Sequence, residues 1–224
     1  MRKIISITLT ILIIVLTSCG AESIDSPFSE VTLGDIIELG GIELRVLDIK
    51  DGKALVISDK VLEQRVWHHE QKSLSWDVSD IRQYLNGDFF DNTFAPEERT
   101  FIAETRVTTE ANPWFATHGG TDTHDRVFLL SVEEVVRYFG DSGEIKNFRG
   151  MESPLSDEYN SSRVARNAQT DEAAWWWLRT PGRNINPRVH FSAVAVGGGG
   201  EVFIYGIYVI AEQGGVRPAM WIYI

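Results

Sequence analysis

The first strong pattern in the chain is an alternation of apolar and polar residues over residues 42–49, IELRVLDI. Every second residue from Ile42 to Val46 is apolar, which is the period of a β-strand with one buried face. Asp51-Gly52 follows, and a second apolar run, KALVIS, comes directly after it. Asp-Gly between two such runs is typical of a tight turn, so the two segments are predicted to form a β-hairpin.

A helical period replaces the alternation further along the chain. Ile81, Tyr84, Leu85 and Phe89 recur at the spacing of one face of a helix. Asp77 precedes them and is placed to cap the first turn. We therefore predict an amphipathic helix here.

Two further helices are predicted. Pro96 suits the first turn of a helix over residues 95–104, APEERTFIAE. Ser131 followed by Glu134 forms the capping box of a third helix. The apolar stripe of this third helix consists of Val132, Val135, Val136 and Phe139.

Residues 175–224 are rich in aromatic and β-branched residues, which favour strands. Residues 197–200 are four glycines between two apolar runs and predict a hairpin, because glycine adopts positive φ at no steric cost. The run EVFIYGIYVI, residues 201–210, is apolar on both faces, so we expect a central strand that is buried on both sides. The apolar end MWIYI, residues 220–224, is expected to pair within a sheet because it would otherwise be exposed. Strands, then helices, then strands predict an α+β domain.

Three tryptophans stand in a row at positions 175 to 177. In a strand, Trp175 and Trp177 would share one face and Trp176 would lie on the other. Two interpretations are open. Either one side packs in the core and the other beneath a loop, or one face supplies aromatic rings to a ligand site for sugars or apolar groups. The polar loop RNINPR, residues 183–188, follows directly and is the kind of segment on which binding groups tend to sit.

The beginning of the chain is laid out like a secretory signal peptide. Arg2 and Lys3 precede an apolar run that ends near Leu16 and is too short to span a membrane. The residues Leu-Thr-Ser before Cys19 resemble the lipobox of bacterial lipoproteins, in which the cysteine is lipidated and the chain is cut just before it. An ordinary signal peptide with a chance cysteine is the alternative.

The lipobox resemblance divides the chain into three expected parts. They are a lipoprotein signal peptide at residues 1–18, a lipidated tether at residues 19–30 and one domain at residues 31–224. Lipid on Cys19 would hold the domain outside the cytoplasm, anchored to a bacterial membrane. Because Cys19 is the single cysteine of the chain, we expect no disulfide, and stability must come from the core.

Net charge excludes one class of partner. The formal net charge is −11, and loss of the signal peptide would remove two basic residues and no acidic one. An acidic protein is repelled by nucleic acid, and no basic stripe interleaved with aromatic residues occurs. We therefore expect no nucleic-acid partner.

Four motifs occur in a fixed order: WDVSDIRQYLN at residues 76–86, DRVFLLSVEEV at 125–135, WWLRTPG at 176–182 and GVRPAMW at 215–221. Together they resemble an uncharacterised family of bacterial secreted domains (DUF6273-like), and the likeness covers nearly all of residues 33–224. That family is similar to the C-type-lectin-like fold, which is also seen in formylglycine-generating enzymes. The resemblance implies an α+β, C-type-lectin-like single domain with a mostly antiparallel sheet and two or three short helices. It also implies a structural framework made of Trp76, Arg82, Leu85, Asn86, Trp176, Arg179, Gly182, Arg217 and Pro218.

Candidate chemistry is sparse. Formylglycine-generating relatives act through cysteines that this domain lacks, and the calcium-binding motifs of lectins do not occur, so we expect no cofactor. The segment from His118 to Asp125 gathers two histidines and two carboxylates, which are groups that ligate zinc and other transition metals. Its spacing matches no established metal motif, so no metal site is predicted.

Three functions remain open. The first is a lipid-anchored extracytoplasmic binding module without catalytic activity, for an unknown glycan or protein ligand. The second is a metal-assisted hydrolase that acts on envelope polymers through the segment from His118 to Asp125. The third is an interaction subunit of a surface complex, which predicts an exposed apolar patch. The ligand site expected for the first comprises Trp175, Trp177, Asn184, Asn186 and Arg188, together with Trp114 and His118.

Overall fold

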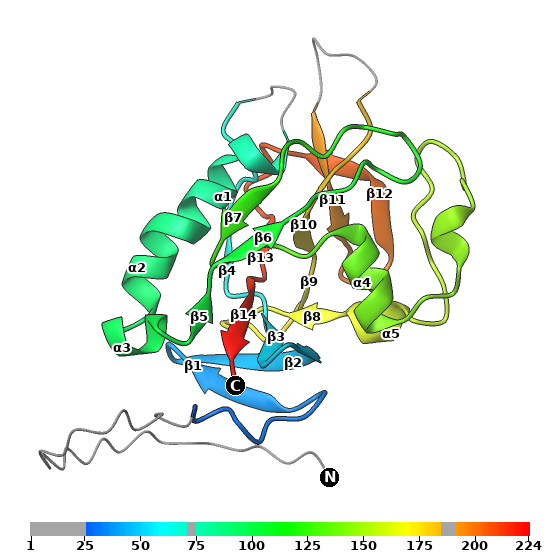
Figure 1. Ribbon diagram of the computed structural model, residues 1–224. Helices are drawn as coiled ribbons and strands as arrows, with labels where there is room; N and C mark the ends of the chain where they lie inside the picture. The colour runs from blue at the N-terminus through cyan, green and yellow to red at the C-terminus, as the bar shows by residue number, and fades with distance from the viewer. Residues whose placement is uncertain (1–25, 71–74, 185–190) are drawn as a thin grey trace, which may run out of the picture.

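Two five-stranded sheets dominate the computed structural model, which describes residues 26–70, 75–184 and 191–224 (Figure 1). The first sheet contains, in spatial order, β1 (Ile36–Leu39), β2 (Ile42–Lys50), β3 (Lys53–Ser58), β14 (Ala219–Tyr223) and β5 (Ile102–Ala103). The second contains β12 (Val202–Tyr208), β11 (Ser192–Val196), β10 (Trp176–Pro181), β13 (Gly215–Val216) and β4 (Glu63–Gln64). Two small ribbons pair β6 (Thr105–Val107) with β7 (Thr123–Asp125) and β8 (Ala165–Arg166) with β9 (Ala173–Ala174).

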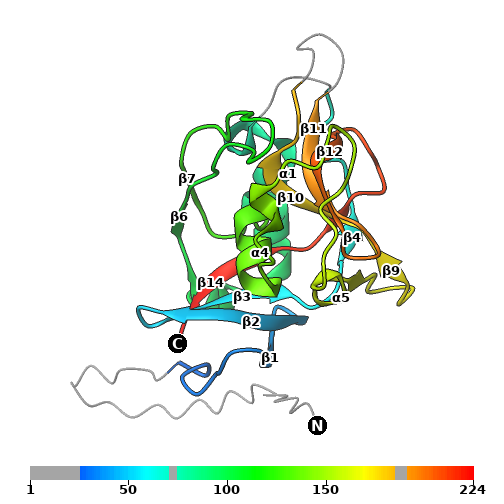
Figure 2. The ribbon, with the colours of Figure 1, turned by 90° about the vertical axis from the view of Figure 1, so that its right-hand side faces the viewer.

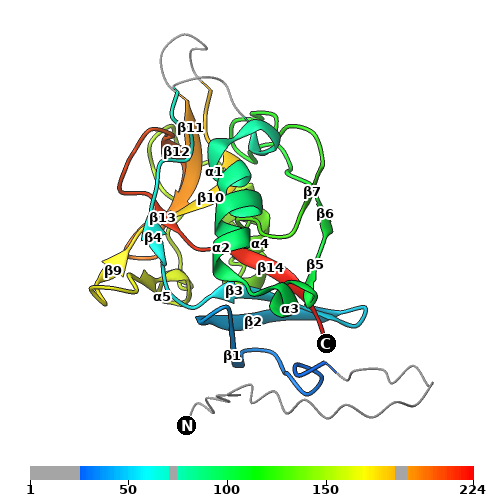
Figure 3. The ribbon, with the colours of Figure 1, turned by 90° about the vertical axis from the view of Figure 1, so that its left-hand side faces the viewer.

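The helices are short. They are η1 (Trp76–Val78), α1 (Asp80–Tyr84), a π-type turn η2 (Leu85–Phe89), α2 (Phe90–Thr93), α3 (Pro96–Arg99), α4 (Val132–Phe139), η3 (Glu144–Lys146) and α5 (Asn160–Arg163). Figure 2 places α4 in front of the central strands, and Figure 3, from the opposite side, places α1 and α2 in front. None of the described helices combines the length and apolar character needed to cross a bilayer.

Strand pairing confirms the α+β prediction with mostly antiparallel sheets and few short helices. Among the described strands, each ladder is antiparallel except that of β10 with β13, which is parallel. The predicted hairpin is β2 and β3, and both Asp51 and Gly52 have the positive φ of 52° and 70° that its tight turn requires. The glycine hairpin also forms between β11 and β12, with Gly200 at φ 86°.

The predicted third helix is confirmed as α4. The side chain of Ser131 accepts a hydrogen bond from the Glu134 N–H at 3.2 Å, and Glu134 accepts one in return from the Ser131 N–H at 2.8 Å. Its apolar stripe is buried as predicted. This helix was predictable because the capping box and the stripe are both local features of the sequence.

The start and end of the other two helices differ from the prediction. Ser79 caps α1 by accepting from the Arg82 N–H at 3.3 Å, whereas Asp77 lies one turn earlier and accepts from the hydroxyl of Thr121 at 2.8 Å. The helix after Pro96 ends at Arg99, because the residues that follow pair with β14 as strand β5. Tertiary pairing therefore overrides the local helical pattern here.

The prediction that residues 201–210 form a central strand is wrong. This strand, β12, lies at an edge of the second sheet. Val202 and Ile204 face the core, whereas Phe203 and Tyr205 face outward and are partly buried. The rings of Phe203 and Tyr205 pack edge to face, with their centres 5.7 Å apart. The outer face of this edge strand is therefore apolar because the two aromatic rings shield each other.

The two sheets meet where two chain segments pass from one sheet to the other. Residues 58–63 run from β3 to β4, and residues 216–219 run from β13 to β14. The segments are hydrogen-bonded to each other, since the Ser58 N–H donates to the Pro218 carbonyl at 2.9 Å. We call this place the sheet junction. The last strand, β14, is held between β3 and β5, as expected from its apolar sequence.

Candidate functional site

A buried carboxylate organises the first family motif. Asp125 is 1% exposed, and its oxygens accept from the indole N–H of Trp76 at 2.8 Å, Arg82 Nε at 2.7 Å and the hydroxyl of Thr123 at 2.6 Å. Asn86 joins the same two segments, because its amide donates to the Val127 carbonyl at 2.8 Å and accepts from that residue's N–H at 3.2 Å. These contacts fit the structural role that the resemblance implies for Trp76, Arg82 and Asn86.

Arg179 is the centre of a second buried network. Its guanidinium donates to both carboxylate oxygens of Glu134, to the Leu129 carbonyl at 2.8 Å and to the Thr108 carbonyl at 3.0 Å. Arg179 therefore links β10 to the capping box of α4. Gly182 follows the strand where an added Cβ would lie 2.3 Å from the hydroxyl of Ser192, so this position accepts no side chain without movement.

Arg217 and Pro218 form one half of the sheet junction. Arg217 is 2% exposed; its Nε donates to the Ser58 carbonyl at 2.8 Å and its Nη2 to the Asp59 carbonyl at 3.4 Å. Its guanidinium carbon lies 4.9 Å from the ring centre of Trp176 and 5.4 Å from that of Phe139. Such positions over aromatic faces stabilise a cation. Burial lowers the pKa of Arg217 to about 10.

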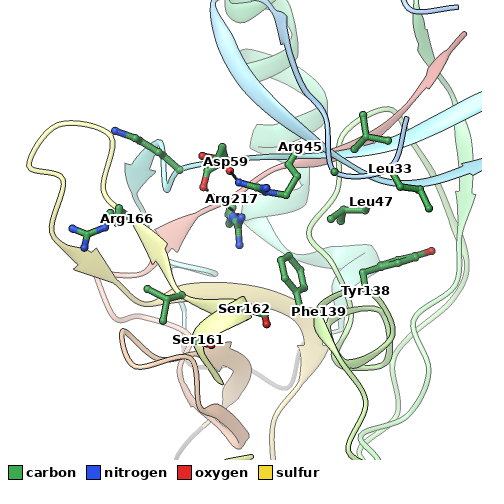
Figure 4. Close-up of a pocket in the computed structure, with 14 residues that line it drawn as sticks. Leu33, Arg45, Leu47, Asp59, Tyr138, Phe139, Ser161, Ser162, Arg166 and Arg217 are labelled. Carbon is green, nitrogen blue, oxygen red and sulfur yellow. Dashed lines mark hydrogen bonds and ion pairs between the residues drawn. The ribbon is translucent and has the colours of Figure 1, made fainter. Parts of the chain in front are cut away.

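A cavity of about 730 Å³ opens beside the sheet junction (Figure 4). This volume is in the range of sites for small molecules, about 300–1,000 Å³. Figure 4 shows the guanidinium end of Arg217 directed into the space between Asp59 and Phe139. We call it the Arg217 cavity, and its other polar lining residues are Arg45 on β2, Asp59 and Lys60 at the junction, Tyr138 on α4, Ser161 and Ser162 on α5, and Arg166 on β8.

Most charged side chains of this lining lie within ion-pair distance of a group of opposite charge, but among the described residues that of Arg217 does not. Arg45 forms an ion pair with Asp59, and both Lys60 and Arg166 lie within ion-pair distance of the exposed carboxylate of Asp171. Arg217 has no ion pair with a carboxylate among the described residues, and its Nη1 is buried there without a hydrogen-bond partner. The lining therefore contains three basic side chains that have carboxylate partners and one guanidinium, that of Arg217, that is incompletely bonded.

The predicted tryptophan face has a different role in the structure. Trp177 is fully buried, and its indole N–H donates to the Arg65 carbonyl at 2.8 Å. Trp176 is equally buried on the other face and donates to the Arg163 carbonyl at 3.2 Å. Trp175 is partly buried, with its ring edge to face on Trp177 at 4.8 Å. Since Trp177 has no exposed face, the first interpretation, packing on both sides of the strand, describes it.

The other predicted ligand residues lie elsewhere. Asn184 is exposed beyond the far end of β10 from Trp175, and a six-residue strand is about 20 Å long. Trp114 is near that far end, since Asn112 of the same loop donates to the Pro181 carbonyl at 2.8 Å. Asn186 and Arg188 fall outside the described residues, as does Cys19. Among the described members of the predicted site, Trp175 and Asn184 therefore lie at opposite ends of β10.

The segment from His118 to Asp125 does not assemble a metal site. Asp122 forms an ion pair with Arg106, Asp125 is buried in the network with Trp76, and His118 accepts from the Gly120 N–H at 2.9 Å. Across residues 26–70, 75–184 and 191–224, no group of three or more histidine, cysteine, aspartate or glutamate side chains could hold a metal ion. The geometry that the hydrolase hypothesis needs is thus not found in this segment.

Comparison with known protein families shows to which family the chain belongs. The model of the family described as Domain of unknown function (DUF6273) matches residues 51–224. The chain belongs to the DUF6273 family. No curated protein and no solved structure matches it.

The DUF6273 match includes most of the Arg217 cavity, but Arg45 and the rest of β2 precede it. Sequence reasoning did not find this cavity. Arg217 was assigned to the structural framework. Its neighbours in the cavity, Arg45, Asp59 and Ser162, lie outside the four family motifs. The available signal for the cavity was Arg217 itself, an arginine of the GVRP motif that is expected to be buried and whose carboxylate partner the sequence does not identify.

Proposed function

We propose that the protein is a lipid-anchored extracytoplasmic binding module without catalytic activity, and that the Arg217 cavity is its ligand site. One observation carries the site: a cavity of suitable volume contains a buried guanidinium whose Nη1 has no partner among the described residues. Unpaired buried donors are rare, and a bound ligand is one of the ways in which they are satisfied. The buried carboxylates of Asp125 and Asp157 support the non-catalytic role, because Asp125 is bonded to Arg82 of the framework and Asp157 to the buried Arg163.

Binding at the cavity is tested by blocking it. Ser162 is exposed on α5 and lines the cavity, so Ser162→Trp fills space without removing a core contact. The purified protein is screened by thermal shift against glycans, peptidoglycan fragments and divalent metals with a chelator control. A ligand at about 100 times its dissociation constant adds about 2.7 kcal/mol to the folded state. A ligand that shifts the wild type and Ser162→Trp equally would contradict the cavity as the site.

The anchor is tested separately. Cys19→Ala removes the only residue that the lipobox resemblance makes a lipid acceptor. We expect the wild type in the membrane fraction and the variant in the soluble extracytoplasmic fraction after fractionation of an expressing bacterium. Ser18→Ala, which leaves a small residue before the cysteine, is the matched control and should remain with the membrane. Equal membrane retention of Cys19→Ala and the wild type would contradict the lipid anchor.

We also propose that the fold is C-type-lectin-like, as the family resemblance implies. The placement of β14 beside β3 supports this, because strands from both ends of the domain then share one sheet. An experimental structure compared with C-type-lectin-like domains is the test. A different strand order in the core would contradict it.

An exposed aromatic group favours the interaction subunit as a second candidate. Phe148 is 56% exposed, and its ring lies edge to face with Trp114 at 5.9 Å and with Phe115 at 5.8 Å. Met151, three positions after Phe148 in the sequence, is 53% exposed. In affinity purification from the native membrane, Phe148→Asp should lose a specific partner, and Val78→Asp, a change at another exposed apolar residue, should keep it. Identical partners for both variants would count against this role.

A further inference from the structure

We propose that the Arg217 cavity binds a small organic carboxylate whose charged group meets Arg217 and whose apolar part lies against Phe139 and Val164. The inference rests on the proposed function, because it names the ligand class of the same cavity. It is carried by the bonding of Arg217, by the charge of the lining and by the mixture of hydroxyl and apolar groups around it.

Arg217 differs from the other buried arginines of the described chain. Arg163 and Arg179 each have one nitrogen without a partner as well, but each also bonds to both oxygens of a carboxylate, Asp157 and Glu134 respectively. Arg217 is held by carbonyl oxygens and aromatic faces alone. Guanidinium groups form their strongest paired hydrogen bonds with carboxylates and phosphates, so a ligand oxyanion would complete Arg217 as the acidic side chains complete the other two.

The balance of charge favours a single negative charge on the ligand. Four basic side chains and one carboxylate line the cavity. Arg45 is paired with Asp59, and Lys60 and Arg166 share Asp171. This leaves Arg217 as the cation of the lining without a carboxylate among the residues described. A carboxylate matches one such cation, whereas a doubly charged phosphate would bring an uncompensated charge next to the carboxylate of Asp59.

The remaining lining describes the rest of the ligand. Ser161 and Ser162 present exposed hydroxyls from α5, and Phe139 forms an apolar wall with Val164. Figure 4 places Phe139 on the opposite side of the space from the Arg45–Asp59 pair. A ligand with its charge at one end and an apolar body at the other fits this arrangement, because each end then meets the matching wall.

Matched pairs of small molecules test the charge requirement. The full chain, purified in detergent, is titrated calorimetrically with benzoate and phenylacetate, with the neutral amides of both, and with phenyl phosphate. We expect the carboxylates to bind at least about tenfold more tightly than the amides, since a charged partner for a buried arginine contributes well over one power of ten. Phenyl phosphate should bind more weakly than the carboxylates.

Variants place the binding. Arg217→Gln should abolish carboxylate binding, and circular dichroism shows whether it is folded. Arg166 is exposed, so Arg166→Gln tests the cavity without removing a buried contact. It should weaken binding about two- to fivefold. Arg126→Gln is the matched control at an exposed arginine paired with Glu104 outside the cavity, and it should change nothing. Ser162→Trp should block binding.

The outcomes separate the two proposals. Amides that bind as tightly as the carboxylates and are blocked by Ser162→Trp would overturn the ligand class and leave the binding site standing. Phenyl phosphate as the tightest ligand would overturn the class in favour of phosphate. Carboxylate binding that survives Ser162→Trp, or equal effects of Arg166→Gln and Arg126→Gln, would overturn the site. Binding of none of these molecules would overturn the carboxylate inference, and the glycan and peptidoglycan screen would then decide the proposed function separately.

Discussion

Glu134 supports two structural features, and replacing it by glutamine separates charge from shape. Its carboxylate accepts from the Ser131 N–H at 2.8 Å to complete the cap of α4, and it forms the ion pair with Arg179. The side chain of Arg179 is only 4% exposed in that pair. Glu134→Gln keeps the size of the side chain and an oxygen that can accept at the cap, but it leaves the guanidinium without its negative partner.

The expected cost follows from burial. Removing one partner of a fully buried ion pair costs about 3–5 kcal/mol. The Glu134 side chain is 26% exposed, and the amide oxygen still accepts one hydrogen bond, so we expect about 2–3 kcal/mol. For a domain of this size that corresponds to a fall of about 5–10 °C in melting temperature.

Glu133 is the matched control, because Glu133→Gln makes the same chemical change one residue earlier. Burial raises the pKa of Glu133, and its Oε2 is buried without a hydrogen-bond partner in the described part of the chain. An acid whose folded pKa is raised loses stability as pH rises above its ordinary value of 4.5. Glu133→Gln should therefore stabilise the protein at neutral pH, and this gain should vanish below that value.

Urea unfolding followed by tryptophan fluorescence measures both variants. A double variant, Arg179→Met with Glu134→Gln, removes both charges and should recover part of the loss, because no buried charge is then left unpaired. Changes of equal sign and size in the two single variants, within about 0.5 kcal/mol, would refute the assignment of Glu134 as the partner that holds Arg179.

Two further predictions concern acid stability and close packing. Burial, the largest single influence on Asp157, would raise the pKa of its carboxyl, but hydrogen bonds led by that of Arg163 lower it overall. The wild type should therefore lose stability as pH falls below the ordinary value of 3.8, and Asp157→Asn should lose less over that interval in acid titrations of the unfolding midpoint. Gly214→Ala would place a Cβ 1.8 Å from Trp177 Nε1 and should cost about 1–3 kcal/mol, whereas Gly198→Ala, with its nearest neighbour at 3.7 Å, should cost far less. Equal melting temperatures for the two alanine variants would contradict the assigned packing of Trp177.

Elements encoded by neighbouring residues were the ones that the sequence predicted. The turn at Asp51-Gly52 and the capping box from Ser131 to Glu134 each need only a few consecutive residues, and both form as expected. Residues 102–103 show the limit of such reasoning. Their pattern continues a helix, and the partner that makes them a strand is at the other end of the chain.

The candidate site was less predictable because it is made by long-range contacts. Arg217 bonds to Ser58, which is 159 positions away in the chain, and no local spacing records that pairing. Trp177 shows the same limit, since strand alternation gave the correct face but could not show that the ring is buried with its indole N–H bonded to the Arg65 carbonyl. Alternation predicts which side chains share a face, whereas burial of that face depends on the segment packed against it.

The position of β14 has a consequence for how the polypeptide acquires its structure. Its five residues lie between β3 and β5, and both partners come from the first half of the chain. Until Ala219–Tyr223 arrive, β3 and β5 each present an unpaired edge, and such edges recruit other chains. Pairing over so great a sequence separation is intrinsically slow. We therefore expect a nascent polypeptide that stops before Ala219 to be aggregation-prone and dependent on chaperones, even though nearly all of its core residues have already been synthesised.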